Sequence, residues 1–206
     1  GKIVLISINE GISIMTTKLP ASFLPAKFQV LSGSALKLIA IILMLIDHTG
    51  LMILYNYPAT TATLFSFGGV DYSWYRIFRD IGRAAFPIFC FLLIEGFLHT
   101  HDVKKYALNL GIFALVSEVP FDLAFAGKPF YLNYQNVFFT LFIGLVMMIF
   151  LQKIDEKTHQ DGTNWRGANW KVSIGKLLVI VAACTVATLL KTDYSAMGIL
   201  TIVLIV

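Results

Sequence analysis

The segment ALKLIAIILMLIDHTGLMILY, from Ala35 to Tyr55, is long and apolar enough to cross a lipid bilayer as a single helix of about 20 residues. Lys37 lies near its start, and the pair Asp47-His48 lies near its end. A charged side chain at the bilayer centre costs about 3 kcal/mol on insertion scales, so it must face a cavity or a partner. We therefore expect Asp47 and His48 to be functional, and His48 is the first candidate for chemistry.

The composition of the whole chain is that of an integral membrane protein. Of its 206 residues, 57% are hydrophobic and 14% are charged, against roughly 45–50% and 25% in soluble domains. The sequence predicts an all-α, polytopic transmembrane helix bundle with spans at residues 35–55, 84–100, 105–124, 135–151 and 172–190, and a sixth that begins near Ser195.

The two ends of the chain fit this pattern less well. The sixth span has only about 12 residues before the sequence stops, so we expect the domain at 35–206 to be incomplete at its C-terminal end. Residues 1–34 are expected to be a separate leader. Cys90 and Cys184 fall inside predicted spans, where a thiol behaves as a small apolar group, and they indicate neither a disulfide nor a metal site.

The distribution of basic residues predicts an orientation in the cell membrane. Eleven of the 16 lysine and arginine residues fall on the side that contains the N-terminus. By the positive-inside rule this side is cytoplasmic, which makes the loop Asn56–Gly82 extracytoplasmic. Asp47 and His48 then lie in the outward half of the first span.

Three arginines lie before the second span, and their spacing places them on one face if this segment is helical. Arg76, Arg79 and Arg83 follow an i, i+3, i+7 pattern, with Asp80 placed to pair with Arg76 or Arg83. They bind a ligand or an internal carboxylate, or alternatively they contact lipid head groups. We expect one of them to meet Asp47.

His48 has two possible chemical roles. Its imidazole could act as a general base toward an attacking amine or hydroxyl, or it could carry the acyl group itself. The alternative is a structural hydrogen bond to a neighbouring helix. Asp47 and His48 are consecutive, so on a helix their side chains point about 100° apart and we expect no direct dyad.

Other polar groups also occur at membrane depth. Glu118 and Asp122 flank Pro120, which we expect to break the helix beside a cavity. Asn136 opens the next span, either as an N-cap or as a binding residue.

Three further features carry structural expectations. Glu95 and His99 have i, i+4 spacing and are expected to touch through their side chains. Pro87 is expected to kink the second span near Arg83. Residues 152–171 are expected to form a flexible polar loop.

Four segments, in the same order along the chain, carry a family resemblance: Leu36–Gly50, Ile81–Phe97, Ser117–Leu123 and Asn136–Thr140. Together they resemble the TraX family, over about Ala35 to the end of the chain. The resemblance implies a role in conjugation, in the N-terminal acetylation of pilin. It also places the chain among multi-span membrane acyltransferases, whose first span carries a basic residue and, after ten intervening residues, a catalytic histidine; Lys37 and His48 match this pattern. The Arg-x-x-Arg motif of those relatives is similar to Arg76–Arg79, although here it precedes the second span.

The resemblance implies acetyl transfer from acetyl-CoA to a protein, glycan or lipid acceptor at the bilayer, with no nucleic acid as partner. As catalytic residues we expect His48, Asp47, Arg79, Arg83 and Glu118, and as substrate-binding residues Lys37, Arg76, Asp122 and Asn136. Two other classes of protein remain possible. One is a small proton-coupled transporter, although the two halves of the chain show no matched broken helices. The other is a non-catalytic assembly subunit of a conjugation or secretion apparatus, in which the polar groups only join helices.

Overall fold

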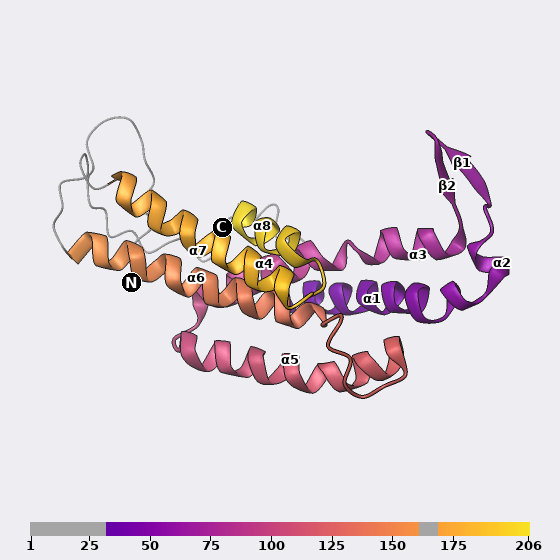
Figure 1. Cartoon of the computed structure of the whole chain (residues 1–206), viewed down its shortest axis with the longest axis horizontal. Coiled ribbons are helices and arrows are strands. Elements are labelled where there is room, and N and C mark those ends of the chain that lie inside the picture. Colours follow the sequence, from indigo (N-terminus) through magenta and orange to yellow (C-terminus); the bar gives the residue numbers. More distant parts are fainter. Residues whose placement is uncertain (1–31, 161–168) are drawn as a thin grey trace.

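The computed structural model describes residues 32–160 and 169–206 and is built almost entirely from helices (Figure 1). The helices are α1 (Gly33–Met52), the single turns η2 (Leu54–Asn56) and α2 (Pro58–Thr61), α3 (Trp74–Gly82), α4 (Ala85–His99), α5 (Val103–Ala126), α6 (Val137–Gln160), α7 (Asn169–Leu189) and α8 (Ser195–Ile205). Five stretches of the described residues are long and apolar enough to cross a membrane, and α8 is a shorter apolar helix. The predicted all-α, multi-pass membrane class is confirmed.

The first helix begins at Gly33, two residues before the predicted span. The side chain of Ser32 caps α1 by accepting a hydrogen bond of 3.2 Å from the backbone N–H of Ala35, which satisfies one of the free donors at a helix start. The span predicted at residues 84–100 corresponds to α4, and the full membrane-length stretch Trp74–His99 also includes α3, which is separated from α4 at Arg83 and Ala84. Pro87 lies in the first turn of α4, where its missing N–H has little cost. The predicted interruption near Arg83 is therefore confirmed.

Between α2 and α3 the chain forms a small antiparallel hairpin that the sequence analysis did not predict. Its strands are β1 (Phe65–Phe67) and β2 (Val70–Tyr72), joined by two glycines with positive φ. The rings of Phe65 and Tyr72 stack across the pair with centroids 5.0 Å apart. Figure 1 shows the hairpin at one end of the molecule, away from α4 to α8.

Two structural expectations are wrong. Pro120 does not break its helix, because α5 continues from Val103 to Ala126. A proline within a helix removes one backbone hydrogen bond and crowds the carbonyl four residues earlier. Membrane helices tolerate this, because neighbouring groups and small backbone adjustments satisfy the freed carbonyl. The polar loop expected at 152–171 is largely helical, since α6 continues to Gln160 and α7 begins at Asn169. Its centre, residues 161–168, lies outside the described residues.

The apolar core is formed mainly by α4, α6 and α8, with α7 beside them. Its fully buried members include Cys90, Leu145, Ile199 and Ile202. Each of the helices α1 and α5 has only two buried residues. Helix α1 packs on α3 and α4, whereas α5 packs chiefly on α6. A space bordered by α1 and α5 therefore lies at the edge of the core rather than within it.

Candidate functional site

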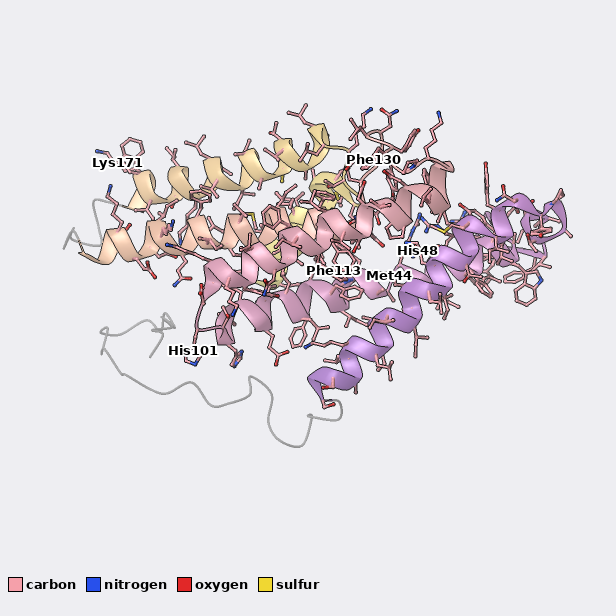
Figure 2. All side chains as sticks on the ribbon, turned by 90° about the horizontal axis from the view of Figure 1, so that it is seen from below. Met44, His48, His101, Phe113, Phe130 and Lys171 are labelled. Atoms are coloured by element: carbon pink, nitrogen blue, oxygen red, sulfur yellow. The ribbon has the colours of Figure 1, made fainter. Side chains whose placement is uncertain are left out.

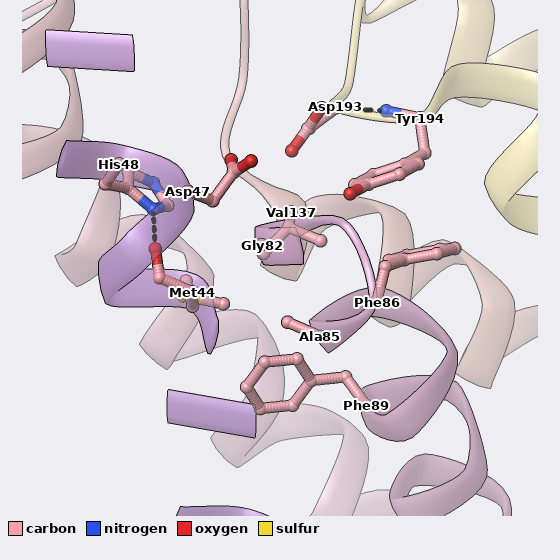
Figure 3. A pocket seen from close by; sticks show the side chains of 10 residues that line it. All are labelled: Met44, Asp47, His48, Gly82, Ala85, Phe86, Phe89, Val137, Asp193 and Tyr194. Carbon is pink, nitrogen blue, oxygen red and sulfur yellow. Dashed lines mark hydrogen bonds between the residues drawn. The ribbon is translucent and has the colours of Figure 1, made fainter. Parts of the chain in front are cut away.

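His48 is half-buried on α1, and a backbone contact fixes the state of its ring. Its Nδ1 lies 2.8 Å from the carbonyl oxygen of Met44 (Figure 3). A carbonyl oxygen only accepts hydrogen bonds, so in the neutral ring Nδ1 carries the hydrogen and Nε2 keeps its lone pair. No described residue hydrogen-bonds Nε2. The ring is thus in the tautomer that a general base requires.

Two adjoining cavities meet at His48. The polar pocket has an empty volume of about 270 Å³, open solvent included, and is lined by Met44, Asp47, His48, Gly82, Ala85, Phe86, Phe89, Val137, Asp193 and Tyr194 (Figure 3). The apolar groove lies between α1, α5 and the start of α6, with about 850 Å³ of empty volume measured in the same way. It is lined by Ile41, Met44, Leu45, His48, Met52, Ser117, Pro120, Phe121, Asn136, Val137, Phe138 and Asp193. The ring of His48 is therefore reachable from both sides.

Asp47 meets an arginine from the loop before the second span, as predicted. Its Oδ2 accepts a hydrogen bond from the guanidinium of Arg79, and both side chains are more than four-fifths buried. The backbone of α3 approaches closely here, because a Cβ on Gly82 would lie 2.6 Å from the Cα of Asp47. Asp47 and His48 make no hydrogen bond with each other, which agrees with their 100° separation on a helix.

The other two arginines of the predicted stripe do not share this position. Arg76 is exposed and pairs with Asp80 across one helical turn at 3.6 Å, as its spacing predicted. Arg83 is exposed and lies just past the end of α3. The structure therefore brings only Arg79 into direct contact with the first span.

The residue that sequence reasoning missed is Asp193, in the short turn between α7 and α8. Its Oδ1 accepts hydrogen bonds from the hydroxyl of Tyr134, at 2.6 Å, and from the backbone N–H of Tyr194, at 3.1 Å. Burial raises the pKa of Asp193 above its ordinary value, and burial together with the carboxyl group of Asp193 raises the pKa of Tyr194 to about 12. Asp193 lines both cavities with His48.

The turn that contains Asp193 has an unusual backbone conformation and is held in place by contacts with α4 and α6. Lys191, Tyr194 and Ser195 have positive φ, and the hydroxyl of Thr140 donates to the backbone carbonyl of Asp193. The ring of Phe86 stacks on Tyr194 with centroids 4.0 Å apart. The only signal in the sequence was a Thr-Asp-Tyr sequence between two apolar runs, with no spacing that relates it to His48.

Glu118 and Asn136 join α5 to the start of α6. The Oε2 of Glu118 accepts hydrogen bonds from the backbone N–H of Asn136, at 3.1 Å, and from its side-chain amide. The Oδ1 of Asn136 accepts from the N–H of Phe138 at 2.9 Å, so its predicted role as N-cap is confirmed. Asn136 also lines the apolar groove, whereas Glu118 lies behind it.

Two predicted site residues, Asp122 and Lys37, lie apart from both cavities. Asp122 is 1% exposed and accepts a hydrogen bond of 2.6 Å from the N–H of Tyr131, so it stabilises the loop after α5. Lys37 is exposed on α1, about 16 Å along the helix from His48. The contact that their spacing allows between Glu95 and His99 is a structural hydrogen bond to the backbone and not one between the two side chains. The Nδ1 of His99 contacts the backbone carbonyl of Glu95 at 2.8 Å, because that carbonyl is within easy reach one turn away.

Comparisons with known proteins agree with this architecture. A family model described as "TraX protein" matches residues 32–206. The chain is also 33% identical, over 126 residues, to the "Probable fimbrial assembly protein FimC, serogroup H1" of Dichelobacter nodosus. That match covers 57% of this chain and 46% of the relative, so the chain spans less than half the length of the protein that it matches. No solved structure matches.

Proposed function

Because this chain belongs to the TraX family, we propose that it is a membrane-embedded acetyltransferase that moves an acetyl group from acetyl-CoA to an acceptor at the membrane. The supporting observation is the state of His48, whose Nδ1 is held by the Met44 carbonyl while Nε2 remains free between two cavities. A positioned imidazole base accelerates such a step by about 10²–10⁴.

The proposed step needs only His48 and the two substrates. The acceptor amine or hydroxyl gives its proton to Nε2 while its nitrogen or oxygen forms a bond to the thioester carbon. The carbon–sulfur bond then breaks, and the leaving thiolate takes the proton from Nε2. Coenzyme A leaves as the thiol, and the imidazole returns to its neutral state.

The charged groups on α1 suggest how acetyl-CoA is placed. Lys37 is exposed one residue after the first turn of α1, on the side that the positive-inside rule makes cytoplasmic. In this proposal Lys37 contacts the anionic nucleotide, and the pantetheine arm covers the roughly 16 Å to His48. The pair Asp47–Arg79 fixes α1 against α3 and so holds the imidazole in place.

A second candidate function is a non-catalytic part in pilus or fimbria assembly. The observation that favours it is the printed name of the Dichelobacter nodosus relative, a probable fimbrial assembly protein. In this case the polar groups around His48 only join helices, and His48 can be replaced without loss of function. A setting in pilus biogenesis is compatible with both candidates, since the acceptor could itself be a pilus subunit.

The test compares two histidines that make the same local contact. His48 and His99 each have Nδ1 at 2.8 Å from the carbonyl four residues earlier, but His99 is exposed and lines neither cavity. Membranes that contain the wild type, His48→Gln or His99→Gln are supplied with labelled acetyl-CoA, and label is measured in the protein, glycan and lipid fractions. We expect His48→Gln to lower transfer about 100-fold or more and His99→Gln to leave it unchanged.

Equal transfer by the wild type and His48→Gln, at equal protein level, would remove His48 from the chemistry. The result would then favour the assembly role. Loss of transfer in both variants would show that the effect comes from replacing any histidine of this kind.

A further inference from the structure

Two carboxylates in the polar pocket have oxygens without a hydrogen-bond partner. The Oδ1 of Asp47 is buried and unpartnered within the described part of the chain. Asp193 uses only Oδ1, and no described residue donates to its Oδ2. Figure 3 shows the two side chains pointing toward one another across the pocket, with His48 beside Asp47.

The charges in this pocket are unequal. Asp47 is neutralised by Arg79, whereas Asp193 forms no ion pair within the described residues. Both carboxylates accept hydrogen bonds only. The pocket therefore has spare acceptors and spare negative charge, and a primary ammonium group supplies three donors and one positive charge.

The apolar groove begins beside the polar pocket, at His48, and extends along α1 toward Ile41. The groove residues of α1 are Ile41, Met44, Leu45, His48 and Met52, which share one helix face. Between Ile41 and His48 this face is apolar over about 10 Å. The polar end at His48 lies toward the end of the span, and the apolar end lies toward its middle, which is how a lipid is arranged in one leaflet of a bilayer.

The width of the groove limits what can occupy it. The rings of His48 and Phe121, on opposite walls of the groove, make an edge-to-face contact with centroids 6.0 Å apart. The groove is therefore narrow at this end, whereas an α-helix with its side chains is about 10–12 Å wide. An extended peptide would need partners for its backbone N–H and C=O groups, and the part between Ile41 and Leu45 offers none from side chains. A hydrocarbon chain is narrower than a helix, and it has no backbone N–H or C=O groups that need partners.

We propose that the polar pocket and the apolar groove together bind a phospholipid with a primary-amine head group, the ammonium between Asp47 and Asp193 and one acyl chain along α1. This inference rests on the proposed function in one respect, since it makes this lipid the acceptor that is acetylated beside His48. The ammonium first gives one proton to solvent, and the neutral amine then gives its second proton to Nε2 of His48 as it forms the bond to the thioester carbon. Arg83, which is exposed at the end of α3 next to the pocket-lining Gly82, is available to the lipid phosphate.

Binding can be measured without acetyl-CoA, so the inference is tested separately from catalysis. The full chain in detergent micelles is given phosphatidylethanolamine and phosphatidylcholine with identical acyl chains, and the retained lipids are counted by native mass spectrometry. The trimethylated head group keeps the charge but has no N–H donor. We expect phosphatidylethanolamine to be retained about tenfold better, as hydrogen bonds to a charged group imply.

Two pairs of variants locate the site. Asp193→Asn keeps an acceptor for Tyr134 but removes the charge, and it should abolish the preference for the amine; Asp71→Asn, at an exposed carboxylate in the hairpin, should not. Leu45→Trp fills the groove and should lower the retention of both lipids. Ile42→Trp, which is exposed on the same helix but does not line the groove, should have no effect.

Equal retention of the two lipids by the wild type would overturn the inference, as would unchanged binding in Leu45→Trp. Displacement of the lipid by a short apolar peptide with a free N-terminus, but not by its N-acetylated form, would assign the same site to a peptide amine and also overturn it. If the preference is found while acetyl transfer fails, the proposed function falls together with the lipid's role as acceptor, and the lipid-binding site stands. If transfer depends on His48 but no preference is found, only this inference falls.

Discussion

Among single residues, the polar groups around His48 depend on contacts between segments that are far apart in sequence. Arg79 holds Asp47, while Tyr134 and the backbone of Tyr194 hold Asp193. Each carboxylate keeps one oxygen for the pocket. The site is therefore sensitive to changes in residues that do not face the cavities.

The ion pair between Asp47 and Arg79 gives a first prediction. We expect Arg79→Ala to lower the free energy of unfolding by about 3 kcal/mol, because it leaves a buried carboxylate uncompensated. Arg76→Ala is the control: the Arg76–Asp80 pair is close to half exposed, and such pairs contribute only about 0–1 kcal/mol. Thermal or denaturant unfolding in micelles measures both, and an equal effect of the two substitutions would contradict the prediction.

Asp193 gives a prediction about pH. Its pKa in the folded protein is raised by burial above the ordinary value of 3.8, so above about pH 4 the folded state binds more protons than the unfolded state. Stability should then fall as the pH rises from 3.8 through the raised pKa. Asp193→Asn should show a flatter dependence of the unfolding temperature between about pH 4 and 7. Identical slopes in the wild type and the variant would contradict this.

Among secondary-structure elements, the long apolar helices could be predicted from the sequence. The short hairpin and the effect of Pro120 on its helix could not. The spans follow from length and composition alone, and the contact between Asp47 and an arginine follows from the cost of a charge in lipid. The hairpin at β1 and β2 was missed because three-residue strands carry too little alternation to be recognised. The prediction at Pro120 was wrong because a membrane helix can accommodate a proline by small backbone adjustments and continue beyond it.

Asp193 shows the main limit of reasoning from sequence at this scale. It lines the same cavities as His48 because the turn between α7 and α8 folds back over the start of α6, where Gln135 and Thr192 form a bridge. That placement comes from tertiary packing and from residues with positive φ, not from any local periodicity. The spacing of residues within one helix therefore could not relate Asp193 to His48.

The close packing of α3 against α1 gives a prediction for these elements. A Cβ on Gly82 would lie 2.6 Å and 2.7 Å from the Cα and N of Asp47, so Gly82→Ala should force the helices apart and cost about 1–3 kcal/mol of stability. Gly175→Ala in α7 meets its nearest atom at 3.8 Å and should be neutral or stabilising by up to about 1 kcal/mol. The same unfolding assay compares them, and a neutral Gly82→Ala would mean that α1 and α3 are less tightly packed than described.

For the whole molecule, the arrangement of spans predicts which surfaces face each side of the membrane. With the N-terminus in the cytoplasm, the loop before β1 is outside and the turn between α4 and α5 is inside. A membrane-impermeant maleimide added to intact cells should label Thr63→Cys and not His101→Cys, both at exposed positions. The reverse pattern would invert the orientation. Wild-type protein, with Cys90 buried and Cys184 half-buried, gives the background.

The two walls of the apolar groove have separate supports. Helix α1 is attached on one flank, to α3 and α4, and α5 is attached chiefly to α6 (Figure 2). The gap between α1 and α5 is therefore set mainly through the core helices α4 and α6 and through the edge contact of His48 with Phe121. Lateral pressure and bilayer thickness act on that gap. The same polypeptide, reconstituted in thin and thick membranes, should differ in how far the imidazole stands from the ring of Phe121, so lipid composition becomes a control over access to the reactive nitrogen.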